Sequence, residues 1–253
     1  VFPAPPEITA ISAVYRRDWQ GNVALSASPR TNIILQSENL TTTWITNSGT
    51  LTVTATTLED TDAGAASSRK QINTVANDSL VRWASVLVAK NAPNLVLIRW
   101  SLSGGTSVST ALVFDTISGA WGVNQNYGNK PTADMVSIVD LGINGWRVSL
   151  KLINNNSGNT VSTFFLYPAF ATILAGSGDT AVINSLTGSA GFTKMQLEQS
   201  TSPTSYIPTT SVPVTVTDYV ASGTTLTLAE VPARAAELTV DGTGVGIPML
   251  RIA

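Results

Sequence analysis

Alternation of apolar and polar positions recurs along most of this chain, and it is the pattern of half-buried β-strands. Residues 79–90, SLVRWASVLVAK, alternate cleanly between two faces. Residues 134–142 and 145–153 alternate on either side of a Gly-Ile-Asn-Gly turn, so they predict a β-hairpin. Further strand-like runs cover residues 31–36, 49–57, 93–103, 107–115, 160–170 and 191–199.

Glycine, asparagine, serine and threonine separate these runs at the spacing typical of a β-sandwich, which predicts roughly nine or ten strands. Sustained helical periodicity is absent, and we expect at most one helical turn in each of residues 65–72 and 179–185. The fold class is therefore predicted to be all-β, with two antiparallel sheets packed as a sandwich.

The pattern changes near both ends of the chain. Residues 1–30 begin with VFPAPPE, which is too rich in proline to join a central strand, so we expect an extended arm. Residues 195–210, MQLEQSTSPTSYIPTT, alternate and then break at proline, as a closing strand and exit linker would. We therefore predict a sandwich over 31–210 and a small C-terminal β unit over 211–253.

Composition excludes several function classes. Charged residues are only 12% of the chain, about half the usual share, so the surface must consist largely of uncharged polar groups. The net charge is −2 and no basic block occurs, so we expect no nucleic-acid partner. The chain has no cysteine and no histidine, which removes disulfides and the commonest general base. No apolar run is long enough to span a membrane, and VFPAPPEITA lacks the order of a signal peptide, so we expect assembly in the cytoplasm.

Five segments, in order, resemble the carbohydrate-binding-module-like jelly-roll of tailed-phage virion proteins, such as head spike fibre, decoration and tail fibre proteins. They are SPRTNIILQSENLTTTW (28–44), WASVLVAK (83–90), VFDTISG (113–119), SIVDLGINGWRVSLKL (137–152) and MQLEQSTSPTSYIPTT (195–210). The resemblance covers about residues 28–210.

The resemblance implies a two-sheet jelly-roll in a structural component of a virion, acting as a capsid decoration or head fibre protein, or as a tail fibre or adaptor. It implies a homo-oligomer, with a trimer as the expected state, that binds major capsid or tail proteins after assembly in the host cytoplasm. Members often carry a larger enzymatic domain, which this chain lacks, so we expect no enzymatic activity. The alternative that the resemblance leaves open is a module that binds host-surface glycan.

Contacts with neighbouring subunits are expected from the two terminal segments. Arg16, Arg17 and Trp19 form the densest charged and aromatic cluster, which is either a solvated turn or an anchor of the kind found at interface hot spots. The last residues, GIPMLRIA, are predicted to form an edge strand that pairs with a neighbour. The predicted anchor residues are Arg16, Arg17, Trp19, Tyr219, Leu250 and Ile252.

Glycan binding needs exposed aromatic rings beside planar polar groups. Trp83 and Trp100 lie beside Arg82 and Arg99 on strands that we expect to be adjacent, so they form either a binding face or part of the core. Trp121 falls in a predicted loop, where we expect its ring to be exposed. The candidate glycan-binding residues are Trp83, Trp100, Trp121 and Tyr127.

Acidic residues are sparse and suggest structure rather than catalysis. Glu59, Asp60 and Asp62 fall in a predicted turn, which is either a solvated loop or a site for a structural Ca²⁺ ion. No other cofactor is expected, since nucleotide-binding glycine loops are absent. For Glu198, in the closing strand, we expect a structural hydrogen bond or salt bridge.

Overall fold

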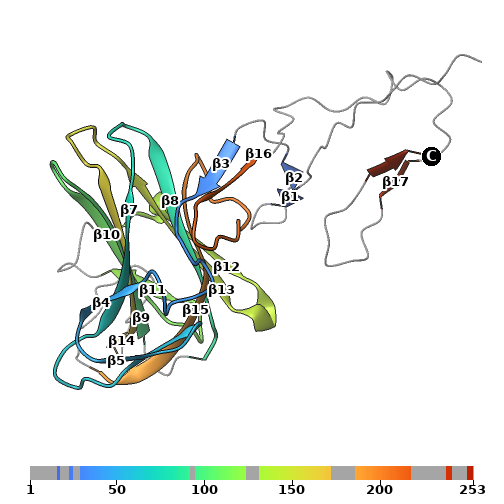
Figure 1. Cartoon of the computed structure of the whole chain (residues 1–253). Coiled ribbons are helices and arrows are strands. Elements are labelled where there is room, and N and C mark those ends of the chain that lie inside the picture. The colour runs from blue at the N-terminus through green and yellow to red at the C-terminus, as the bar shows by residue number, and fades with distance from the viewer. Residues whose placement is uncertain are drawn as a thin grey trace, which may run out of the picture. The chain divides into compact units, whose positions relative to one another are not determined.

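Two antiparallel sheets of six strands each pack face to face in the computed structural model (Figure 1). The structure describes residues 16–17, 23–24, 29–91, 95–123, 131–171, 186–217, 238–240 and 250–252. This architecture confirms the predicted all-β sandwich and is consistent with a jelly-roll-like fold. Among the described residues, none belongs to a helix with the length and hydropathy required to cross a bilayer.

The first sheet has the strand order β11-β10-β9-β14-β7-β4. Its strands are β4 (Ile45–Ser48), β7 (Ser68–Thr74), β9 (Leu95–Ser103), β10 (Val108–Phe114), β11 (Trp121–Val123) and β14 (Val161–Ala171). The second sheet has the order β12-β13-β8-β15-β6-β5. Its strands are β5 (Leu51–Val53), β6 (Thr57–Asp60), β8 (Val81–Val88), β12 (Val136–Asp140), β13 (Trp146–Ile153) and β15 (Gly188–Gln199).

The chain divides into two compact units, one of residues Arg30–Thr215 and one that joins Val1–Pro29 to Val216–Ala253. These boundaries lie within a few residues of the predicted ends of the sandwich. Short elements complete the described chain: β1 (Arg16–Arg17), β2 (Val23–Ala24), β3 (Pro29–Asn32), β16 (Val214–Thr217), β17 (Leu238–Val240), β18 (Leu250–Ile252), and the 3₁₀ turns η1 (Ala133–Met135) and η2 (Gly142–Asn144). Antiparallel pairs join β1 to β2 and β17 to β18.

Local predictions fail at β7 and at the step from β8 to β9. Residues 65–72 do not form a helical turn, because most of them belong to β7, which pairs with β14 and β4. The expected adjacency of β8 and β9 is also wrong, because the chain crosses between them from one sheet to the other. The predicted hairpin of residues 134–142 and 145–153 is confirmed as β12 and β13.

Large apolar side chains from both sheets fill the interior. Trp44, Trp100, Phe114, Phe164 and Phe192 are all at most 1% exposed and belong to one continuous cluster. Alternation along each strand places these residues on the inner faces. A second, smaller cluster gathers residues of β9, β10 and β14 that alternate with those of the main core, such as Leu97, Val113 and Tyr167. The interior therefore has the dense aromatic packing of a stable sandwich.

Three loops at one end of the sandwich are joined by uncharged hydrogen bonds. The amide of Asn159 donates to the Thr106 carbonyl at 2.7 Å and accepts from the Gly105 N–H at 3.0 Å. The Asn154 amide donates to the carbonyls of Ala76 and Asn159 at 2.9 and 3.0 Å. Asparagine side chains thus join these loops, beside the ion pair of Arg82 with Asp78 at 2.6 Å.

Candidate functional site

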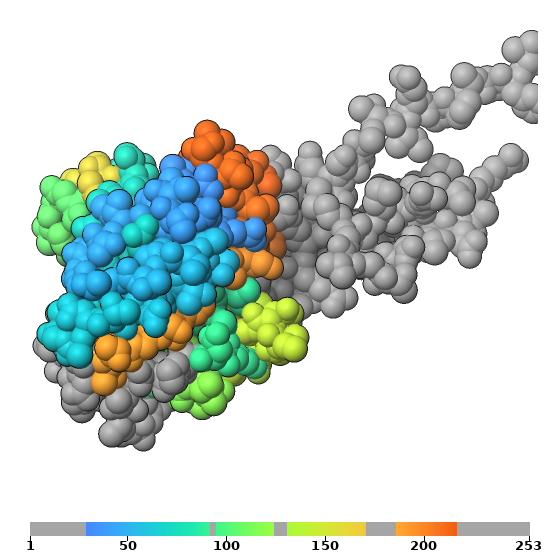
Figure 2. All heavy atoms as spheres, turned by 60° about the horizontal axis from the view of Figure 1, so that its bottom comes forward, coloured from blue at the N-terminus to red at the C-terminus, as the bar shows by residue number. Residues whose placement is uncertain are grey.

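Two segments far apart in the sequence form what we call the closing seam, residues 29–38 and 195–210. The Gln36 N–H donates to the Thr210 carbonyl at 2.7 Å, and the Met195 N–H donates to the Ser37 carbonyl at 2.9 Å. β3 and β16 extend this contact as a two-stranded sheet. Figure 2 shows the segment that starts at residue 29 (blue) and the segment that ends at residue 217 (orange-red) side by side on the surface.

Asn32 bonds to four backbone groups of the seam and is completely buried. Its amide donates to the carbonyls of Met195 and Ile207 at 3.0 and 2.8 Å. Its side-chain oxygen accepts from the N–H groups of Ile34 and Leu197 at 3.1 and 3.0 Å. One side chain thus satisfies backbone groups that no sheet ladder reaches.

Glu198 fixes the linker that follows β15. Its carboxylate accepts from the Thr204 N–H at 2.9 Å and from the Thr204 hydroxyl at 2.5 Å, and lies 3.5 Å from the Arg30 guanidinium. We expected a structural hydrogen bond or a salt bridge for Glu198, and the side chain forms both. Burial raises the pKa of Glu198, although the Thr204 bonds and the Arg30 charge oppose that effect.

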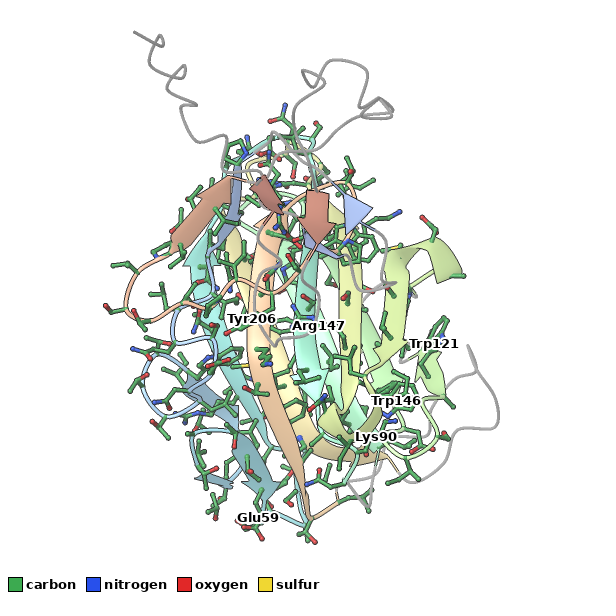
Figure 3. The ribbon with its side chains drawn as sticks, turned by 90° about the vertical axis from the view of Figure 1, so that its right-hand side faces the viewer. Glu59, Lys90, Trp121, Trp146, Arg147 and Tyr206 are labelled. Atoms are coloured by element: carbon green, nitrogen blue, oxygen red, sulfur yellow. The ribbon has the colours of Figure 1, made fainter. Side chains whose placement is uncertain are left out.

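Arg147 and Tyr206 continue the seam across the outer face of the second sheet (Figure 3). The Arg147 guanidinium donates to the Ser85 hydroxyl and to the Lys194 carbonyl, and lies 5.7 Å from the centre of the Tyr206 ring. Burial lowers the pKa of Arg147 to about 9, so the guanidinium stays charged at neutral pH. The Tyr206 hydroxyl bonds to Ser37 at 2.5 Å, which closes the network back onto the first segment.

A second cluster surrounds Trp146, which is paired with Val88 at the C-terminal end of β8. Its indole N–H donates to the Thr116 carbonyl at 2.8 Å, and its ring meets that of Phe114 edge-on at 5.9 Å. The Lys90 ammonium lies 4.3 Å from the ring centre, a favourable cation–π distance. Figure 3 shows Lys90, Trp146 and Trp121 gathered in this region. Trp146 thereby joins the β10–β11 turn to the β12–β13 hairpin.

Both of these turns expose an isoleucine at the tip. Ile117 is 63% exposed and Ile143 is 100% exposed. The Asp115 carboxylate accepts from the Ile117 N–H at 2.8 Å, and the Asp140 carboxylate accepts from the Gly142 N–H at 2.8 Å, so each turn is locked by its own aspartate. Both are single exposed apolar side chains, each on a turn that an aspartate stabilises.

The β12–β13 turn provides a matched pair of glycine substitutions. Gly145 has φ +111° and its missing Cβ would lie 2.3 Å from the Val88 carbonyl oxygen, whereas Gly142 has φ +65° and open space around it. We expect Gly145→Ala to lower the free energy of unfolding by about 2 kcal/mol or more, because the backbone of β8 must shift. Gly142→Ala should cost about 1 kcal/mol, from its left-handed backbone alone. Urea denaturation measures both; equal losses would contradict the prediction.

The structure separates the predicted glycan-binding tryptophans. Trp100 is completely buried, with its indole N–H bonded to the Ser162 hydroxyl at 2.8 Å, and Trp83 is only 6% exposed. Neither ring therefore offers a face to a sugar, and for Trp100 the core alternative holds. Since β8 and β9 lie in different sheets, the expected pairing of these two residues with Arg82 and Arg99 does not form. Trp121 opens β11 rather than a loop and is half-buried against the core.

The predicted calcium ligands point in different directions. Asp60 is 1% exposed, and its carboxylate accepts from the Ser67 N–H at 2.7 Å, the Ser67 hydroxyl at 2.6 Å and the Asp62 N–H at 2.9 Å. Glu59 lies on the opposite face of β6 and is exposed. Within the described ranges, no group of three or more acidic residues is placed to hold a metal ion.

Calcium removal tests this loop directly. Because protein donors already bond to both Asp60 oxygens, we expect EDTA to leave the Tm unchanged, while Asp60→Ala lowers the free energy of unfolding by about 2 kcal/mol through unpaired buried donors. A Tm that falls in EDTA and recovers with added Ca²⁺ would show that the loop does hold the ion.

Several residues predicted to bind a partner or a glycan have no described side chain. Trp19, Tyr127 and Tyr219 lie outside the described residues. Arg16 and Arg17 form β1, and Leu250 and Ile252 begin and end β18, but only their backbone is described. The anchoring role of these terminal residues stays a prediction.

Sequence reasoning missed Asn32, Arg147 and the two exposed isoleucines. Asn32 and Arg147 stand in strand-like runs, where their polarity resembles that of a solvent-facing position. A signal was present at the turns, because Ile117 and Ile143 stand where asparagine, aspartate or glycine is usual. Comparison with models of known protein families gives no match to the chain, and comparison with curated proteins gives none either.

Proposed function

We propose that this chain is a structural component of a tailed-phage virion, a capsid decoration, head fibre, tail fibre or adaptor protein, that acts by binding other virion proteins and copies of itself. The observation that carries the proposal is the closing seam. The first and last segments that resemble the phage jelly-roll are the segments that bond to each other, through Asn32 to Ile207, Arg30 to Glu198 and Ser37 to Tyr206. A set of motifs joined in this way supports a shared fold better than scattered matches would.

The geometry of the seam also suits attachment. The Thr31 and Thr215 hydroxyls lie 2.8 Å apart, so the chain enters and leaves the sandwich at one place. Segments 1–30 and 211–253, which we propose as the contacts with neighbouring proteins, therefore start from a common point.

The proposal is tested by the composition of the particle. We expect mass spectrometry of purified virions of the encoding phage to detect the chain at a constant number of copies per particle. Loss of the seam, by Asn32→Ala, should reduce incorporation, while Asn47→Ala, at an exposed site, should not. A chain that never copurifies with particles would refute the proposal.

The alternative, a module that binds host-surface glycan, rests on Trp121. Of the described tryptophans proposed for this role, only Trp121 keeps a partly exposed ring, and ring faces stack on sugars. Glycan-array binding that disappears in Trp121→Ala, and persists in Ile117→Ala on the neighbouring turn, would favour this alternative.

A further inference from the structure

The two sheets have four edge strands, and among these β12 has the longest regular edge without a hydrogen-bonded neighbour in the described chain. Among the described strands it has a neighbour on one side only, β13. The other three ends are protected by shortness or irregularity, since β5 and β11 have three residues each and β4 carries a register shift. β12 has five residues in regular register and no proline. An exposed regular edge of this kind is a template for pairing with another strand.

The hydrogen-bond phase of the hairpin identifies which groups of β12 face outward. The Leu141 N–H donates to the Gly145 carbonyl at 2.9 Å. Along an antiparallel edge strand, residues whose backbone groups bond to the neighbouring strand alternate with residues whose backbone groups point to the free edge. The backbone groups of Ser137 and Val139 therefore bond to β13. Those of Ile138 and Asp140 point away from it, toward the free edge.

The side chains of this edge suit a partner strand without charge. Residues 136–139 are Val-Ser-Ile-Val, and all four are partly exposed. Val136 and Ile138 pack against the core from the inner face, so a second strand would complete the cover over them. Burial of this apolar surface would add to the hydrogen bonds of the edge.

Ion pairs flank the uncharged stretch on both sides. Asp134 lies 2.5 Å from Lys151, and Asp140 lies 2.5 Å from Lys90. If two copies of this edge meet antiparallel, the Asp134 pair of each copy comes beside the Asp140 pair of the other. Each of these carboxylates is already paired with a lysine of its own copy, so the flanks of the edge carry no net charge that would keep two copies apart.

We propose that β12 pairs antiparallel with β12 of a second copy of this chain, joining the two second sheets into one continuous sheet across a two-fold axis. This deepens the self-association in the proposed function by naming its surface. Because it is tested on purified protein, it can fail while incorporation into virions succeeds. It also differs from the trimer that the resemblance implies, since two-fold pairing gives assemblies with an even number of chains.

The test is the mass of the full chain in solution, measured by light scattering after size exclusion, with Ile138→Pro as the blocking variant. Proline removes the outward N–H of Ile138 but no bond to β13, so the sandwich should keep its fold, with a Tm lowered only by the lost packing of the isoleucine side chain. Ser137→Lys is a second block that retains every backbone group and places like charges across the pair. Leu51→Pro is the matched control, because the Thr54 N–H donates to Thr57 and the N–H of Leu51 therefore also points away from its sheet.

We expect the wild-type chain and Leu51→Pro to have an even multiple of the chain mass, and both blocking variants to have half of it. A wild-type chain that is a monomer or a trimer at every concentration would overturn the proposal. So would a folded blocking variant that keeps the wild-type mass. If Ile138→Pro fails to fold, the result for Ser137→Lys decides.

Discussion

Asn32→Ala is expected to lower the free energy of unfolding of the sandwich by about 4 kcal/mol, since each buried group left unsatisfied costs on the order of 1 kcal/mol or more. Four backbone groups lose their partner at once, namely the carbonyls of Met195 and Ile207 and the N–H groups of Ile34 and Leu197. All lie in the closing seam, where Asn32 is completely buried. Urea denaturation followed by tryptophan fluorescence measures the change.

Asn47→Ala is the matched control for this substitution. Asn47 is exposed, and its amide donates to the Ser68 hydroxyl at 3.1 Å. Loss of one bond at the surface should change stability by no more than about 0.5 kcal/mol. If the two variants unfold at the same urea concentration, Asn32 does not hold the seam together and the argument from its four bonds is wrong.

Glu198→Ala should lower the free energy of unfolding by about 3 kcal/mol, because removing one partner of a buried pair leaves the other charge uncompensated. Arg30 loses its carboxylate, and the N–H and hydroxyl of Thr204 lose their acceptor. The control is Glu59→Ala in the neighbouring strand β6, where the side chain is exposed and a change within about 0.5 kcal/mol is expected.

The pH dependence of Glu198→Gln gives an independent measurement. Burial raises the pKa of Glu198 above its usual value of 4.5, so the folded chain favours the protonated acid more than the unfolded chain does. The resulting stability is complete below pH 4.5 and is lost as the pH rises through the folded pKa. In Glu198→Gln this decline should be absent, because glutamine does not titrate. A variant that keeps the wild-type pH profile would show that Glu198 is not its source.

Local patterns predicted the elements whose pairing is local. The hairpin of β12 and β13 follows from alternation on both sides of a turn with Gly142 and Gly145, and both of these glycines have positive φ. Pairing between distant segments was beyond such reasoning. β8 and β9 are consecutive in sequence, yet they lie in different sheets because Val86 and Val88 of one, and Ile98 of the other, point into the same core.

β7 was missed for a different physical reason. Its sequence, SRKQINT, is polar, and a strand within a sheet usually carries apolar residues on the side that faces the core. Gln71 instead bonds to both backbone groups of Leu35, accepting from its N–H at 2.7 Å and donating to its carbonyl at 2.8 Å. A buried glutamine satisfied by a distant backbone segment gives no local signal, and the same holds for Asn32 in the candidate site.

The pairing of β3 with β16 has a mechanical consequence for a chain held by its ends. Thr31 of β3 lies opposite Thr215 of β16, and Gln36 lies opposite Thr210, so the two segments run antiparallel. A force that pulls residues 29 and 217 apart meets these bonds one after another, and the pair unzips at low load. A force that pulls both ends together leaves the bonds between the two segments unloaded and acts instead on the bonds of Asn32 and Arg30 to β15, which it loads together. The same junction would therefore yield to splitting and resist traction.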